Sequence, residues 1–171
     1  MKNNKSTARR VALLGICTSF ALILSYLEFL LPPLFSAVPG IKMGLANIVI
    51  IFILYRVSLK AATAVSICRI LLVSALFGNT MALAYSLAGA VLSLSVMTLL
   101  RKANILSAVG VSVAGAVFHN IGQILMAMLL LGTAELGYYL IVLAVTGTVS
   151  GVLIGICGSI AIHRIPEKYL K

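Results

Sequence analysis

The chain has 171 residues, of which 62% are hydrophobic and 9% are charged, and its mean hydropathy is +1.19. This composition excludes a water-soluble domain, because it supplies too little polar surface, and it predicts an all-α polytopic membrane protein. The net charge of +10 does not indicate nucleic-acid binding, since the basic residues stand in small groups beside long apolar segments, where they suit lipid head groups.

Hydropathy and helix-breaking residues predict six transmembrane helices in one integral membrane domain, residues 1–171. The predicted spans are residues 11–31, 43–56, 61–77, 80–100, 107–131 and 138–162. Basic residues gather at the end of every second span, which is the positive-inside pattern. Both termini are therefore expected on the cytoplasmic side of the membrane.

The first span carries small residues at helical spacing. Ala8 and Ala12 are four residues apart, and so are Gly15 and Ser19. Small residues let helices approach closely in membranes. Ala8 and Ala12 also straddle two arginines at the membrane edge, an unusual place for a purely internal packing face. We therefore interpret these four residues as a docking surface for a partner helix.

The connection to the second span, residues 32–42, contains three prolines and is largely apolar. It is either a lid over an outward-facing pocket or a plain connector at the membrane interface. The second span is short, because a helix from Met43 to Tyr55 covers about 20 Å of a hydrocarbon layer roughly 30 Å thick. We expect this helix either to be tilted or partly re-entrant, or to start near Ile41 with Lys42 snorkelling outward.

Small residues recur on three later spans at intervals that place them on one helix face. The three stripes, which also include Tyr85 and Asn120, are Tyr85, Gly89 and Ser93; Ala108, Ser112, Ala116 and Asn120; and Gly147, Gly151, Gly155 and Ser159. These stripes predict close helix packing within the chain, although one of them could instead dock another membrane subunit.

Lys42 and Arg69 are the two cations that the positive-inside pattern leaves unexplained. Arg69 lies midway along its span, where a charge is costly unless it meets a counter-charge, several carbonyls or an anionic ligand. The chain has three acidic residues, and Glu28 is the one expected near Arg69. The sequence leaves two interpretations open: an Arg69–Glu28 ion pair, or a pair of cations that holds an anionic solute.

The fifth span contains a dense polar cluster, His119, Asn120 and Gln123. Such groups are costly in an apolar helix unless they are hydrogen-bonded, so we expect them to line a binding cavity. Asn47 and Asn79 are predicted to complete the polar lining. A metal site is not expected, because the chain has two histidines and they are predicted at different membrane faces.

Enzyme chemistry has little support in the sequence. The chain has no aspartate, and no nucleotide-binding glycine loop and no grouped nucleophile and base are found. We therefore expect no covalent catalysis by the chain alone and no cofactor.

Four stretches resemble one bacterial family: residues 30–33, residues 39–48 with Pro-Gly-Ile-Lys, residues 69–71, and residues 115–123 with His-Asn-Ile-Gly-Gln. This family is called Gx transporter and is often labelled heptaprenyl diphosphate synthase component I. It is similar in turn to the substrate-binding S components of energy-coupling-factor (ECF) vitamin transporters. That resemblance implies a pocket near the outer face and a first helix that docks onto a transmembrane coupling subunit driven by ATPases.

We therefore expect a subunit of the bacterial cytoplasmic membrane that binds a small anionic, vitamin- or cofactor-like solute and helps to transport it. Lys42 and Arg69 would attract the anion, and the His119, Asn120 and Gln123 face would supply hydrogen bonds. Two alternatives remain: an accessory membrane subunit of a prenyl diphosphate synthase, and a structural partner in a membrane redox complex.

Overall fold

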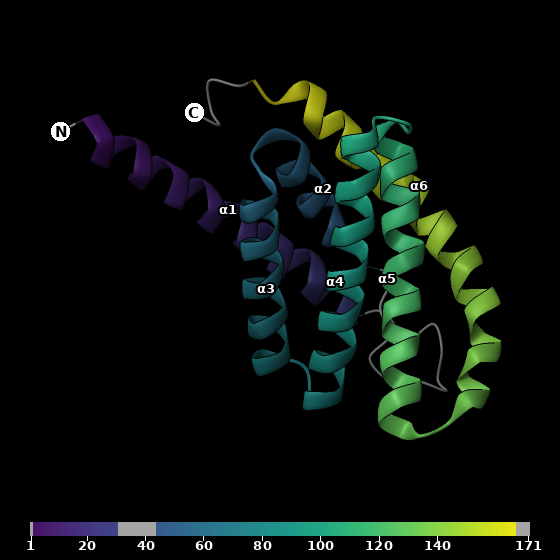
Figure 1. Cartoon of the computed structure of the whole chain (residues 1–171). Coiled ribbons are helices and arrows are strands. Elements are labelled where there is room, and N and C mark those ends of the chain that lie inside the picture. Colours follow the sequence, from purple (N-terminus) through teal and green to yellow (C-terminus); the bar gives the residue numbers. More distant parts are fainter. Residues whose placement is uncertain (1, 31–43, 167–171) are drawn as a thin grey trace.

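The computed structural model describes residues 2–30 and 44–166, with side chains from residue 8 onward. The chain is all-α in these residues (Figure 1). In chain order the helices are α1 (Lys2–Leu30), α2 (Asn47–Arg56), α3 (Leu59–Leu76), α4 (Thr80–Ala103), α5 (Ala108–Leu131), the short 3₁₀ helix η1 (Ala134–Tyr138) and α6 (Tyr139–Arg164). The predicted loop 32–42 and Lys42 lie outside the described residues.

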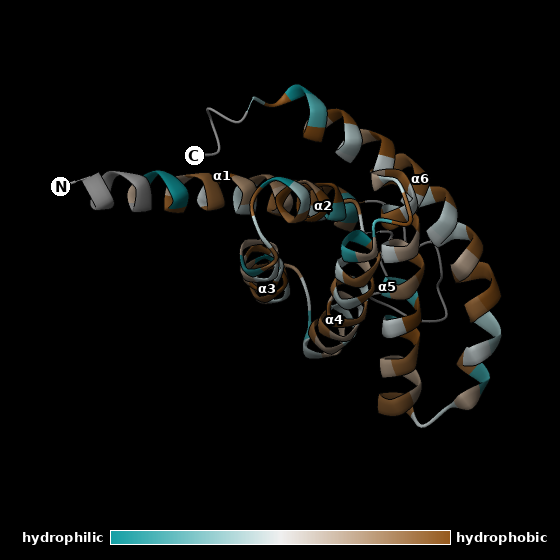
Figure 2. Cartoon of the chain, turned by 45° about the horizontal axis from the view of Figure 1, so that its top comes forward, coloured by the Kyte–Doolittle hydropathy of each residue, from teal (hydrophilic) through white to brown (hydrophobic). Residues whose placement is uncertain are grey.

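Five of these helices, α1, α3, α4, α5 and α6 (the last together with η1), are long and apolar enough to cross a membrane. Their outer faces are apolar: Leu129 is 75% exposed and Ile141 is 76% exposed. Figure 2 shows that such residues run along α5 and α6, with polar residues near the end of α6. Apolar surface of this extent is suited to lipid rather than to water. The prediction of a polytopic membrane protein is confirmed.

The short helix α2 is the centre of the bundle. It contacts α1, α3, α5 and α6, and six consecutive residues, Val49 to Leu54, are buried. A helix that is apolar on all sides must be enclosed by other elements or by lipid. The ten residues of α2 cover about 15 Å, which confirms that the second span is too short to cross the membrane upright.

Two arginines connect the helices at the basic end of the bundle, which is the end with the α2–α3 and α4–α5 connections. Arg101 of α4 donates hydrogen bonds to the carbonyls of Leu54 and Tyr55 at the end of α2 and lies over the Tyr55 ring at 5.1 Å. Arg56 donates to the Ile165 carbonyl after α6, at 2.8 Å. The last carbonyls of a helix have no partner within it, so these cations satisfy groups that the bundle would otherwise bury. The α2–α3 and α4–α5 connections and the end of α6 lie at this same end (Figure 1).

The small-residue stripes of α5 and α6 pack against each other, as predicted for contacts within the chain, and the stripe of α4 meets the opposite face of α5. A Cβ added to Gly151 of α6 would lie 2.7 Å from the Val113 Cα of α5, and one added to Gly155 would lie 2.9 Å from the Val109 Cα. On the other side of α5, a Cβ on Gly122 would lie 2.8 Å from the Ala88 carbonyl of α4. The backbones of α4, α5 and α6 therefore approach one another at the glycines.

The first helix stands partly apart from this bundle. It contacts α2 and α3, while its N-terminal half projects beyond the other helices (Figure 1). Ala8, Ala12, Gly15 and Ser19, the predicted docking residues, are all exposed. A Cβ added to Gly15 would meet nothing within 4 Å. Within the part of the chain that the structure describes, these four residues form no packing contact of the kind seen for the glycines of α5 and α6.

We expect Gly151→Ala to lower the free energy of unfolding by about 1–3 kcal/mol, because the new methyl group forces α5 and α6 apart. Gly15→Ala is the matched control and should be neutral or stabilising by up to about 1 kcal/mol, since alanine favours helix and space is available. Denaturant unfolding of the purified protein in detergent measures both. Equal destabilisation by the two substitutions would contradict the observed packing.

Candidate functional site

Arg69 is a buried cation in the middle of a membrane-spanning helix. Its side chain is 7% exposed, and its Nη1 donates to the Ser25 hydroxyl of α1 at 3.2 Å. Its Nε has no hydrogen-bond partner among the described residues. Glu28, one turn further along α1, lies close enough to interact with Arg69 electrostatically. The guanidinium therefore faces α1 with part of its donor capacity unused.

Glu28 links the end of α1 to the start of α2. Its Oε1 accepts a hydrogen bond from the Gly44 backbone N at 2.5 Å. Gly44 adopts φ +84°, in the left-handed region that favours glycine, and its carbonyl accepts from the Asn47 backbone N at 2.8 Å. A Cβ on Gly44 would lie 2.8 Å from Asn47 Nδ2. Glu28 thus interacts with both the backbone before α2 and the cation on α3.

His119 and Gln123 lie on the face of α5 that meets α4. A Cβ added to Gly89 of α4 would lie 2.9 Å from His119 Nδ1 and 3.0 Å from Gln123 Cγ. His119 is 4% exposed and Gln123 is fully buried. Neither polar atom of the Gln123 amide has a hydrogen-bond partner among the described residues, whereas His119 faces the Gly89 backbone and interacts with it. Buried polar groups are normally paired, so the unpaired Gln123 amide needs an explanation.

Arg69 and His119 belong to the same region of the bundle, because the imidazole lies close enough to experience the charge of Arg69. Side chains of α1 and α3 are thus in contact, and His119 of α5 lies within range of the Arg69 charge. We name Ser25, Glu28, Arg69, His119 and Gln123 the polar cluster. Ser25 was not predicted. The signal available in the sequence was a serine in an apolar span, three residues before Glu28.

The asparagines that were predicted beside these residues have other contacts. Asn120 points toward α6, where its Nδ2 donates to the Leu143 carbonyl at 2.9 Å. Asn79 is exposed and caps α4 by accepting from the Ala82 backbone N at 2.8 Å. Asn47 is half-buried and lies next to Gly44. Of the predicted lining residues that the structure describes, Arg69 and Gln123 have buried polar atoms without a hydrogen-bond partner.

The chemistry of the polar cluster is that of anion recognition. A guanidinium offers donors to a carboxylate or phosphate, and the amide and imidazole add hydrogen-bonding groups of either kind. Among the described residues, no three His, Cys, Asp or Glu side chains gather as metal ligands would.

Taken with five long apolar helices, this arrangement defines a polytopic α-helical membrane protein with a buried polar cluster. The sequence model of the heptaprenyl diphosphate synthase component I family matches residues 17–161. The chain belongs to this family, as its sequence stretches indicated. No curated protein and no solved structure is similar enough to the chain to count as a match.

Two substitutions on α5 separate a structural amide from an unsatisfied one. Asn120→Leu should lower the free energy of unfolding by about 0.5–1.5 kcal/mol, because it removes the bond to α6. Gln123→Leu should be neutral or stabilising, because it replaces an unpaired buried amide by an apolar group of similar size. Denaturant unfolding in detergent compares the two variants, and a loss for Gln123→Leu as large as that for Asn120→Leu would show that Gln123 is a structural residue.

Proposed function

We propose that this protein is a membrane subunit that binds a small anionic solute at the polar cluster and helps to transport it. The observation that carries the proposal is that the buried Arg69 Nε and the buried Gln123 amide have no hydrogen-bond partner among the described residues, with His119 one turn from Gln123 on α5. Leaving such groups unpaired in an apolar bundle costs free energy, and a ligand that completes their hydrogen bonds recovers it.

Each residue has a distinct part in this proposal. Arg69 supplies the charge and a planar set of donors that matches a carboxylate or phosphate. Gln123 offers both a donor and an acceptor, which suits a polar group on the body of the solute. Glu28 competes with the ligand for Arg69, so that binding of an anion would weaken the electrostatic attraction between α1 and α3. Lys42, which lies outside the described residues, is proposed as a second cation for the same solute.

The resemblance to ECF S components supports a proposal about partners. The projecting N-terminal half of α1 exposes small residues at Ala8, Ala12, Gly15 and Ser19. We propose that a transmembrane coupling subunit, driven by ATPases, docks on this face, because helices in membranes associate where small residues permit close approach.

The family name favours a second candidate, an accessory subunit of a prenyl diphosphate synthase. In that role the chain would present a lipid or prenyl substrate and leave the chemistry to a soluble enzyme, since it has no aspartate for binding Mg²⁺-diphosphate. Co-purification of the chain with a prenyl synthase, together with a change in product length, would decide for this candidate.

The binding proposal is tested by mass spectrometry of small molecules retained on the gently purified protein. We expect the wild-type protein to retain an anionic compound and Arg69→Gln to lose it. The retained compound, added at 100 times its Kd, should raise the free energy of unfolding of the wild-type protein by about 2.7 kcal/mol. It should leave that of Arg69→Gln unchanged.

Two further variants keep this experiment decisive. Arg164→Gln removes an exposed cation at the end of α6 and should retain the compound as the wild-type protein does. Glu28→Gln removes the acidic neighbour of Arg69 and should fold and bind, with altered affinity. If Arg69→Gln and Glu28→Gln both unfold the protein, the two residues form a structural ion pair, and the binding proposal fails.

A further inference from the structure

The polar cluster is enclosed by the helices around it. All five of its residues are buried, so a solute can reach them only if helices separate. Sites of this kind exchange their ligands through hinge or shear movements of the elements that cover them. The contacts between the helices show where such a movement breaks least.

Helices α2, α4, α5 and α6 form one unit with close internal contacts. The backbones of α4, α5 and α6 approach one another at glycines, and a Cβ added to Gly158 of α6 would lie 2.6 Å from the Ile51 side chain of α2. Arg101 of α4 donates hydrogen bonds to the last carbonyls of α2. Separation of these helices would break close packing and hydrogen bonds. We call these four helices the core unit.

Helices α1 and α3 form a second unit. Arg69 Nη1 donates to the Ser25 hydroxyl at 3.2 Å. The Phe77 ring, at the end of α3, packs against the rings of Tyr26 and Phe29 of α1, with centroids 5.0 and 5.8 Å apart. Aromatic rings at such separations attract each other, and this contact does not depend on the charge of Arg69. It therefore holds α1 to α3 when an anion binds. We call α1 and α3 the flanking pair.

The flanking pair meets α2 through side chains that are mostly small. Five of its residues lie in the same apolar cluster as the buried residues of α2: Cys17, Ala21, Ala61, Ala62 and Val65. Small apolar side chains interlock little, so helices that meet through them can slide or tilt against each other, as in shear motions.

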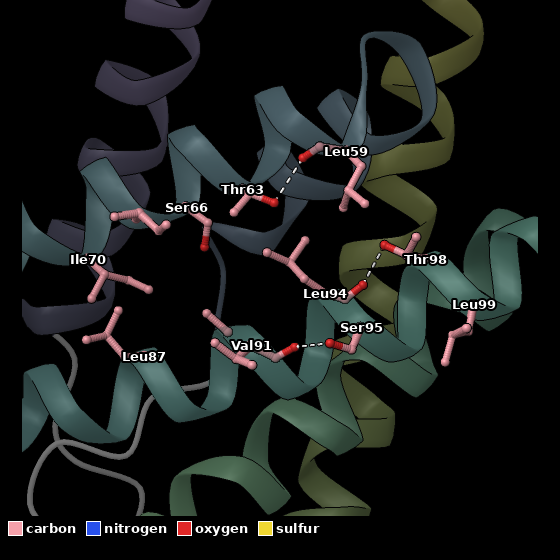
Figure 3. Close-up of a pocket in the computed structure, with 12 residues that line it drawn as sticks. Leu59, Thr63, Ser66, Ile70, Leu87, Val91, Leu94, Ser95, Thr98 and Leu99 are labelled. Carbon is pink, nitrogen blue, oxygen red and sulfur yellow. Dashed lines mark hydrogen bonds between the residues drawn. The ribbon is translucent and has the colours of Figure 1, made fainter.

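Toward α4, the flanking pair leaves an open groove, into which side chains of α3 and α4 point (Figure 3). The hydroxyls of Thr63, Ser95 and Thr98 line it, and each donates to the carbonyl four residues earlier in its own helix, at 2.6–3.0 Å. Among the described residues, no hydrogen bond joins α3 to α4 across the groove. The width of the groove can therefore change without the loss of a hydrogen bond.

The polar cluster is divided between the two units, with Ser25, Glu28 and Arg69 on the flanking pair and His119 and Gln123 on the core unit. We propose that α1 and α3 move together against the other four helices, and that this motion opens the polar cluster to its solute and closes it again. Short connections, residues 57–58 and 77–79, hold both ends of α3, so the motion is a tilt or a slide rather than a dissociation. The role of the motion rests on the proposed function, whereas the motion itself is measurable without the solute.

The motion is tested by the reaction of buried thiols with sulfonatoethyl methanethiosulfonate, a small water-soluble anion. The purified full-length protein is used in detergent, with its three native cysteines replaced by alanine. Ala21→Cys of α1 and Ala62→Cys of α3 place thiols in the cluster shared with α2, and Ala127→Cys of α5 places one inside the core unit; all three alanines are 0% exposed. We expect both boundary thiols to react at least about tenfold faster than the Ala127→Cys thiol, because the boundary between the units opens more often.

A pair of serine variants keeps the test decisive if a cysteine at an alanine position prevents folding. Ser25→Cys, in the polar cluster, and Ser150→Cys, on α6, each replace a buried serine by a residue of nearly the same shape. The Ser25→Cys thiol should also react at least about tenfold faster than the Ser150→Cys thiol, because opening of the polar cluster exposes it.

Three outcomes separate this inference from the proposed function. Equal reactivity of the boundary and core thiols would overturn the motion, even for a protein that retains an anion. Fast reaction of Ala21→Cys alone would show that α1 moves without α3, which also overturns the proposal. Fast reaction of both boundary thiols in a protein that retains no anion would support the motion and contradict the proposed function.

Discussion

The close approach of α5 to its two neighbours is the contact on which the rest of the bundle depends. Gly122 meets the backbone of α4 on one side, and Gly151 and Gly155 of α6 meet the backbone of α5 on the other. In a membrane, helices gain little from burying apolar surface against one another, so packing at this distance supplies much of the attraction. The same contact determines where the polar residues of α5 lie, with His119 and Gln123 toward α4 and Asn120 toward α6.

Two arginines show how differently a cation can be accommodated in this bundle. Arg101 is satisfied within the fold, because the end of α2 presents carbonyls and an aromatic ring to it. Arg69 donates a hydrogen bond to the Ser25 hydroxyl and is attracted by the charge of Glu28, but its Nε has no partner among the described residues. The first arrangement stabilises the chain as it stands. The second is suited to an anion that enters and leaves, because a fully satisfied guanidinium would have no donors to offer.

Helix α3 has two faces of different chemistry. One face contacts α1 through Arg69, and another forms a wall of the groove against α4. The first face meets the polar cluster inside the bundle, and the second borders an apolar groove that is open on its outer side.

The sequence by itself determined the membrane class, the helix order and most helix boundaries to within a few residues, because hydropathy and basic residues are local properties of the chain. It also indicated Arg69, His119 and Gln123, since polar groups in apolar spans stand out without any structure. Only the tertiary structure decided which faces meet. In the folded chain Asn120 bonds to α6 and Asn79 caps α4. Helix α2 lies at the centre of the bundle, and Arg101 donates to its last carbonyls. A groove lies between α3 and α4. These contacts depend on the rotation and tilt of each helix. Rotation and tilt are set by glycine contacts between segments that are distant in the sequence, so no single segment determines them.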